Sequence, residues 1–86
     1  MLAEVFGRVQ GVGFRYSTLE RAEALSLVGT VQNCWNGSVR VVAEGPRVRL
    51  ESLLSWLKQG PMMAQVTRVD HEWRNPTGEY DHFEVI

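Results

Sequence analysis

Three glycines within seven positions separate two regularly patterned segments near the start of the chain. From Gly7 to Arg15 the sequence reads Gly-Arg-Val-Gln-Gly-Val-Gly-Phe-Arg. The apolar run before this stretch predicts a strand over about Leu2–Arg8. The segment after it predicts a helix over Phe14–Leu25, because apolar positions recur on one helical face, at Phe14, Thr18, Ala22 and Leu25. A strand, a glycine-rich loop and a helix must therefore follow one another here.

This loop has the chemistry of a site for a phosphate-sized dianion. Glycines let successive backbone N–H groups converge without clashes between Cβ atoms. Arg15 falls in the first turn of the predicted helix, whose N-terminus carries a positive partial charge. We expect the backbone amides of the loop to bind the anion, namely those of Val9, Gln10, Gly11, Val12, Gly13 and Phe14. The side chain of Gln10 is open to a second interpretation, in which it only braces the loop.

Asn36 and Gly37 lie between two β-prone runs, Val28–Trp35 and Ser38–Glu44. This pair predicts a hairpin with a type I′ turn, because both central residues of that turn need a positive φ. We expect Gly29 to mark the end of the preceding helix. A second helix is predicted next, between the breaks at residues 45–46 and 60–61, with a buried stripe of Leu50, Leu53, Leu54 and Leu57.

The last third of the chain predicts two more strands. Ala64–Trp73 alternates in polarity, but Val66 and Val69 are three positions apart, which predicts a bulge or a shifted register. A turn is expected at residues 75–78 and a short terminal strand at 83–86. The resulting order is βαββαβ with a final short strand. It predicts an α+β fold, the ferredoxin-like α/β sandwich, with a mostly antiparallel sheet covered on one face by two helices.

Composition restricts the classes of partner. The chain has 86 residues, which we interpret as a single domain spanning residues 1–86. Nine Lys and Arg against ten Asp and Glu give a net charge of −1, so we expect no nucleic-acid partner and no cationic membrane face. Cys34 is the only cysteine, which excludes an internal disulfide and zinc ribbons. With no signal-peptide pattern and no long apolar run, we expect a cytoplasmic protein. We also expect a monomer.

Two segments carry a resemblance to a known family. Gly7–Arg15 resembles the first signature of the acylphosphatase family. Residues 29–33, Gly-Thr-Val-Gln-Asn, resemble the second signature together with Gly37, Val39 and Gly45. The likeness extends from about Leu2 to Ile86. It implies hydrolysis of a small-molecule acyl phosphate to a carboxylate and inorganic phosphate, with no metal, no cofactor and no covalent intermediate.

The resemblance further implies that Arg15 and Asn33 are the catalytic residues. A carboxylate leaving group is a weak base, so catalysis reduces to positioning and charge stabilisation. Arg15 can clamp two phosphoryl oxygens at once. Asn33, on a strand that we expect beside the first, faces the loop and orients the attacking water. The family usually has an aromatic residue where this chain has Thr30, so a ring that would wall the pocket is expected to be missing.

Three alternative functions remain open. The first is a non-catalytic ligand-binding module of the same fold. The second is the carbamoyl-phosphate-binding module that begins larger maturation proteins; because the sequence ends at Ile86, we expect a free-standing enzyme. The third is an RNA-recognition domain, which has the same element order. Residues 11–16 resemble its glycine–aromatic motif, but that motif must lie on the third strand, and Ser38–Ala43 contains no aromatic residue.

The histidines and tryptophans have simpler interpretations. His71 and His82 are 11 positions apart, a spacing that matches no compact metal-ligand pattern, so both are expected at the surface. Cys34 is interpreted as a small strand residue, because the sequence places no histidine beside it. Trp35, Trp56 and Trp73 are expected in the core or half-buried on the sheet.

Overall fold

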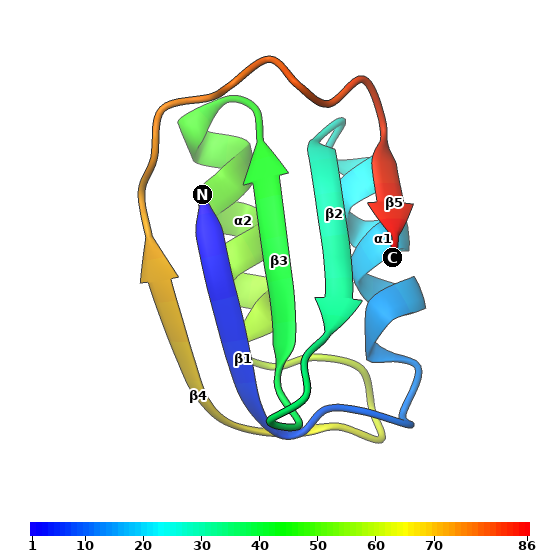
Figure 1. Cartoon of the computed structure of the whole chain (residues 1–86). Coiled ribbons are helices and arrows are strands. Elements are labelled where there is room, and N and C mark those ends of the chain that lie inside the picture. The colour runs from blue at the N-terminus through cyan, green and yellow to red at the C-terminus, as the bar shows by residue number, and fades with distance from the viewer.

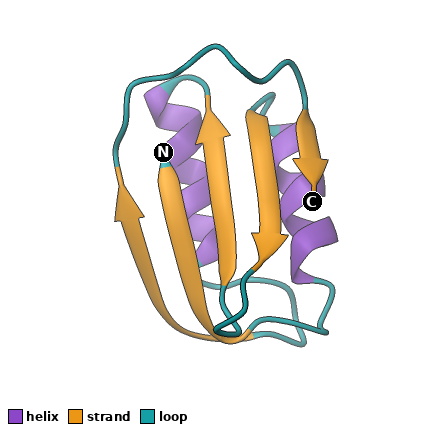
Figure 2. Cartoon of the chain, viewed as in Figure 1, coloured by secondary structure: helices purple, strands orange, loops and turns teal.

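A five-stranded sheet with two helices packed on one face makes up the computed structural model, which describes all 86 residues (Figures 1 and 2). The elements are β1 (Leu2–Arg8), α1 (Phe14–Ala24), β2 (Val28–Asn33), β3 (Val39–Glu44), α2 (Arg47–Leu57), β4 (Gln65–Glu72) and β5 (Phe83–Val85). The strand order is β4-β1-β3-β2-β5, and only the β2–β5 pair is parallel. The predicted ferredoxin-like α+β sandwich is confirmed.

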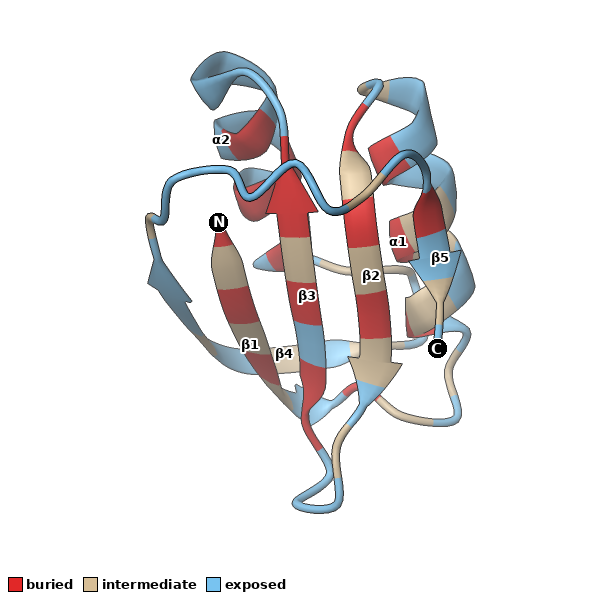
Figure 3. Ribbon diagram, turned by 45° about the horizontal axis from the view of Figure 1, so that its top comes forward, coloured by how far each residue is buried: buried red, intermediate tan, exposed pale blue.

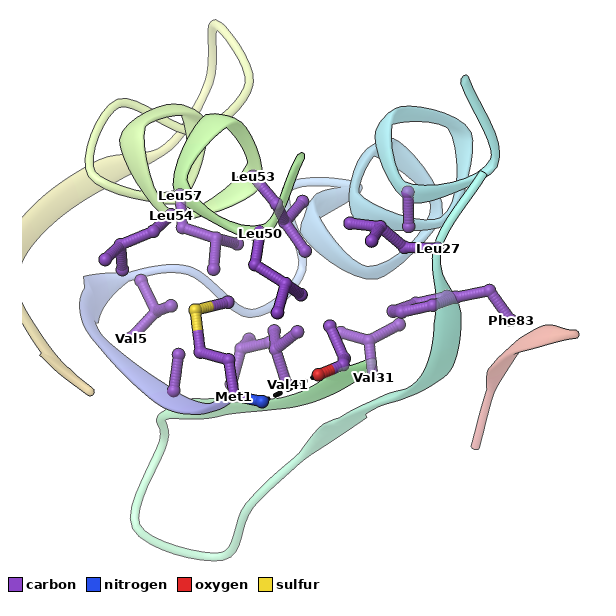
Figure 4. Packing of buried hydrophobic residues seen from close by; sticks show 14 of the residues in the cluster. Met1, Val5, Leu27, Val31, Val41, Leu50, Leu53, Leu54, Leu57 and Phe83 are labelled. Carbon is purple, nitrogen blue, oxygen red and sulfur yellow. Dashed lines mark hydrogen bonds between the residues drawn. The ribbon is translucent and has the colours of Figure 1, made fainter. Parts of the chain in front are cut away.

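The core lies between the helices and the covered face of the sheet. β3 alternates as predicted, with Val39 and Val41 buried and Arg40 exposed on the opposite face. The leucine stripe of α2 is buried (Figure 3) and packs onto the same layer (Figure 4). Leu53 and Leu57 are fully buried, and each such side chain contributes about 1.5–3 kcal/mol by leaving water.

The hairpin between β2 and β3 differs from the predicted turn. The loop has three residues instead of two: Cys34 N donates to Ser38 O at 2.9 Å, and Gly37 N donates to Cys34 O at 3.1 Å. Gly37 has φ 90°, but Asn36 is not in the left-handed region. The prediction of a type I′ turn was therefore wrong. A three-residue hairpin loop needs only one residue with a positive φ, which follows a type I turn. Here that residue is Gly37, so Asn36 does not need a positive φ.

Of the two alternatives predicted for β4, a bulge or a shifted register, the structure has a bulge. Gly7 pairs with Val66 and Phe6 with Arg68, which leaves Thr67 as the extra residue on β4. A single extra residue explains why Val66 and Val69, three positions apart, are both half-buried.

The end of the first helix and the role of Gly29 differ from the sequence expectation. α1 ends at Ala24, and the left-handed residue that follows it is Ser26, with φ 55°. Gly29 lies inside β2, paired with Ala43, so the prediction that it ends the helix was wrong. Neither helix is long and apolar enough to cross a lipid bilayer.

Of the three tryptophans, Trp56 and Trp73 are half-buried as predicted, but Trp35 is fully exposed at 107%. β2 ends at Asn33, so Trp35 lies in the hairpin loop, outside the sheet that was expected to cover it. Aromatic residues favour strands, but Trp35 lies in the tight turn and makes no strand pairing with β3.

Candidate active site

The glycine loop, the β2–β3 hairpin and the connection from α2 to β4 lie at the same end of the molecule (Figure 1). Buried side chains anchor both ends of the loop: Val9 is 1% exposed and Phe14 is 2% exposed. The Phe14 ring also packs against Trp56, with ring centroids 5.7 Å apart. Between these anchors Gly11 and Gly13 have φ 75° and 76°, in the left-handed region that favours glycine. The backbone can therefore curl tightly while its ends stay fixed.

The amides of this loop have no acceptor within the protein. From Val9 to Tyr16, no backbone N–H donates a hydrogen bond to another part of the chain. Gly13 is the N-cap of α1 and has no side chain to cap the first turn. Helix N-termini and unpaired loop amides are donors that water or an anion must satisfy. The loop therefore presents a continuous run of free donors beside the positive end of α1.

These residues surround a hollow of about 200 Å³. Residues from three parts of the chain line it: the loop, the first turn of α1 and the end of β2. They are Val9, Gly11, Gly13, Phe14, Arg15, Tyr16 and Asn33. The hollow thus brings Arg15 and Asn33, predicted as the catalytic pair, to one surface. Gln10 and Val12, predicted as loop binders, are not among its lining residues.

Arg15 is half-buried, and its Nη1 donates to the backbone carbonyl of Ile86 at 3.4 Å. At this length the bond orients the guanidinium weakly and leaves its other donors free. Sequence reasoning missed this contact, because the two residues are 71 positions apart. It also missed Tyr16, which is 62% exposed and lines the hollow. The only sequence signal for Tyr16 is its place beside Arg15 in the first helical turn.

Asn33 is exposed, and its side chain makes no hydrogen bond within the protein. The expectation that β2 lies beside β1 was wrong, because β3 lies between them. Asn33 still reaches the loop from the end of β2. It alternates onto the same face as buried Val31, which is the face that the helices cover.

The Thr30 side chain points away from the face that carries Asn33. It is three positions before Asn33 on the same strand, so it lies on the open face of the sheet. It is also absent from the lining of the hollow. The expectation that Thr30 leaves the pocket without a wall was therefore wrong, since strand alternation removes this position from the pocket.

The amide nitrogen of the Gln10 side chain is hydrogen-bonded away from the hollow. Its Nε2 donates to Cys34 O at 2.8 Å and to Ser38 O at 2.9 Å. This geometry agrees with the bracing role considered for the side chain. The histidines lie elsewhere: His71 and His82 are exposed, and no three His, Cys, Asp or Glu side chains group as a metal site would.

Known proteins of one family resemble the chain over nearly its whole length. A sequence model of the acylphosphatase family matches residues 1–85. An acylphosphatase of Acaryochloris marina is 45% identical over 84 residues, which are 98% of this chain and 89% of the relative. The crystal structure of acylphosphatase from Bacillus subtilis superimposes with a TM-score of 0.89 and 38% identity, covering 100% of this chain and 99% of that one.

A larger protein contains the same fold. Full-length HypF, in a phosphate- and nucleotide-bound form, matches 99% of this chain with a TM-score of 0.83 and 25% identity. The match covers only 11% of the HypF chain. The fold therefore also occurs as a small part of a longer protein.

The fold and these relatives define a small hydrolase of acyl phosphates. The chain belongs to the acylphosphatase family. The chain is therefore not an RNA-recognition domain. The aromatic residues on which such a domain stacks bases have no counterpart on β3.

Proposed function

We propose that the hollow beside the glycine loop holds the phosphoryl group of the acyl phosphate. The amides of Val9 through Phe14 donate to its oxygens, and the positive end of α1 adds to their effect. The run of free amides around a hollow shared by Arg15 and Asn33 is the observation that carries this proposal.

Arg15 supplies the one positive side chain among the lining residues of the hollow. Its planar guanidinium donates to two phosphoryl oxygens in parallel, which a lysine cannot do. Charge spreads over these oxygens in the transition state, so donors fixed in advance stabilise it without having to reorganise. The bond to Ile86 O is long, at 3.4 Å, and leaves the other guanidinium donors free for the substrate.

Asn33 orients the attacking water. Its free carboxamide offers an oxygen that accepts from the water and an N–H₂ group that donates to an oxygen of the substrate. The side chain is uncharged, so it does not repel a dianion as an aspartate would. The leaving carboxylate is a weak base and departs without a strong general acid. The phosphoryl group is thereby transferred to water, and the products are a carboxylate and inorganic phosphate.

Benzoyl phosphate hydrolysis in the presence of EDTA tests this function. We expect turnover that chelation leaves unchanged and that inorganic phosphate inhibits by competition. Carbamoyl phosphate is tested as a second substrate. A carbamoyl-phosphate-binding module would bind this compound but would not hydrolyse benzoyl phosphate. If neither compound is hydrolysed but inorganic phosphate still binds, the protein is a non-catalytic module. Loss of turnover on chelation would contradict the proposed use of protein donors alone.

A further inference from the structure

The side chain of Gln10 makes the only hydrogen bonds between the glycine loop and the β2–β3 hairpin. Its two amide protons go to two different carbonyls, those of Cys34 and Ser38, at 2.8 and 2.9 Å. Both distances are those of well-formed bonds. Since β3 separates β1 from β2, no ladder bond ties the loop directly to the strand that ends at Asn33.

The two carbonyls belong to the residues that close the hairpin loop. Cys34 O also accepts from Gly37 N, and Ser38 O also accepts from Cys34 N. The carboxamide of Gln10 therefore adds a second donor to each of two carbonyls whose positions the turn already fixes. Cys34 directly follows Asn33, so the backbone that Gln10 holds is the backbone that carries the Asn33 side chain.

The hairpin has a second side-chain attachment to the sheet besides Gln10. On the open face of the sheet, the carboxylate of Glu4 accepts from Ser38 Oγ at 2.5 Å and from Asn36 Nδ2 at 3.2 Å. This second attachment joins the hairpin to β1, before the glycine loop begins. The two bonds from Gln10 differ from this attachment because they join the hairpin to the glycine loop itself.

From this geometry we infer that Gln10 is a positioning residue, whose side chain sets the distance between the phosphate held by the loop and the water held by Asn33. This inference rests on the proposed function of the loop and of Asn33. It assigns two roles to one residue: the Gln10 backbone amide belongs to the phosphate site, and its carboxamide aligns the hairpin. An error of about 1 Å between reacting groups costs up to roughly a hundredfold in rate.

The test is a double-mutant cycle with Gln10→Met and Asn33→Ala, measured with benzoyl phosphate and with inorganic phosphate as inhibitor. Methionine keeps the length of the side chain and removes both donors. We expect Gln10→Met to lower kcat about tenfold while KM and phosphate inhibition change less than about twofold. In the Asn33→Ala background we expect the same change to alter kcat less than about twofold, because the group that Gln10 aligns is gone.

Gln32→Met is the matched control. It makes the same chemical change next to Asn33, but Gln32 lies on the open face and its side chain makes no hydrogen bond. We expect its kcat to equal that of the unaltered protein. Gln10→Asn provides a milder variant, since the shortened amide reaches one carbonyl at most. Its kcat should lie between that of the unaltered protein and that of Gln10→Met. If Gln10→Met folds poorly, Gln10→Asn replaces it in the double-mutant cycle with Asn33→Ala.

Two results would overturn the inference. If the losses from Gln10→Met and Asn33→Ala multiply in the double variant, Gln10 acts independently of Asn33. If Gln10→Met weakens phosphate inhibition as much as it lowers kcat, the side chain shapes the loop and not the hairpin. An unaltered kcat in Asn33→Ala alone would instead contradict the proposed role of Asn33, so the two failures are distinguishable.

Discussion

Glu44 and Thr77 are joined by two hydrogen bonds: the Thr77 amide and hydroxyl both donate to Glu44 Oε2, at 2.8 and 2.9 Å. The amide of Gly78 donates to the other carboxylate oxygen at 3.2 Å. Glu44 is 8% exposed and ends β3, over which the segment from β4 to β5 must pass (Figure 1). This carboxylate therefore attaches the segment midway across the sheet, and through it the strand that leads to Ile86.

Glu44→Gln is expected to lower stability in a pH-dependent way. The hydrogen bond from the Thr77 amide is the main cause that lowers the pKa of Glu44 below its usual 4.5. The charged carboxylate thus stabilises the fold above pH 4.5, and this contribution disappears as the pH falls through the lowered pKa. Near neutral pH the loss should be about 1 kcal/mol, since hydrogen bonds to charged groups are the stronger ones. Urea denaturation at a series of pH values measures it, and a difference that persists in strong acid would contradict this assignment.

Trp35→Ser is expected to change the free energy of unfolding by less than about 0.5 kcal/mol, because the side chain is fully exposed. Trp56→Ala is the matched comparison: its ring packs on Phe14 and lies under Arg21, so the loss should reach about 2 kcal/mol. Chemical denaturation gives both values. Equal losses would mean that Trp35 is covered in solution.

Local patterns predicted most of the fold. The extent of β1, the leucine stripe of α2 and the bulge in β4 all follow from the spacing of apolar residues, which is a local property. The position of Trp35 was predicted wrongly, because strand propensity does not say where a ladder stops. The order of the strands was not predictable either, since alternation defines the two faces of a strand but not its neighbours.

The sequence could propose a set of candidate site residues, but it could not give their arrangement in space. The glycines and Arg15 were proposed as site residues because one short segment of the sequence contains them together. Gln10 contacts residues 24 and 28 positions away, and Arg15 contacts Ile86 across 71 positions, and no spacing rule encodes such contacts. The expectation for Thr30 failed for a simpler reason: an odd separation from Asn33 along one strand puts the two side chains on opposite faces.

Arg15→Ala is expected to lower kcat/KM by at least about 10³, because it removes the only charged side chain that lines the hollow. Arg15→Lys should recover only part of the loss, since a point charge cannot donate to two oxygens in parallel. Arg21→Ala is the control on the same helix; Arg21 stacks over Trp56, with 5.6 Å from its Cζ to the ring centroid, and does not line the hollow. Hydrolysis of benzoyl phosphate measures all three variants, and near-normal turnover of Arg15→Ala would reject the proposed role.

Asn33→Ala should lower kcat about a hundredfold while inhibition by inorganic phosphate stays nearly unchanged, because a group that aligns water contributes to the chemical step and not to phosphate binding. Asn33→Asp should behave differently: its carboxylate repels the dianion, so KM and the inhibition constant should both rise, and more so at low salt. Gln32→Ala, one position away on the opposite face, is the control that should leave all constants unchanged. A collapse of phosphate inhibition in Asn33→Ala would instead make Asn33 a phosphate ligand, and the attacking water would then have to be aligned by the loop itself.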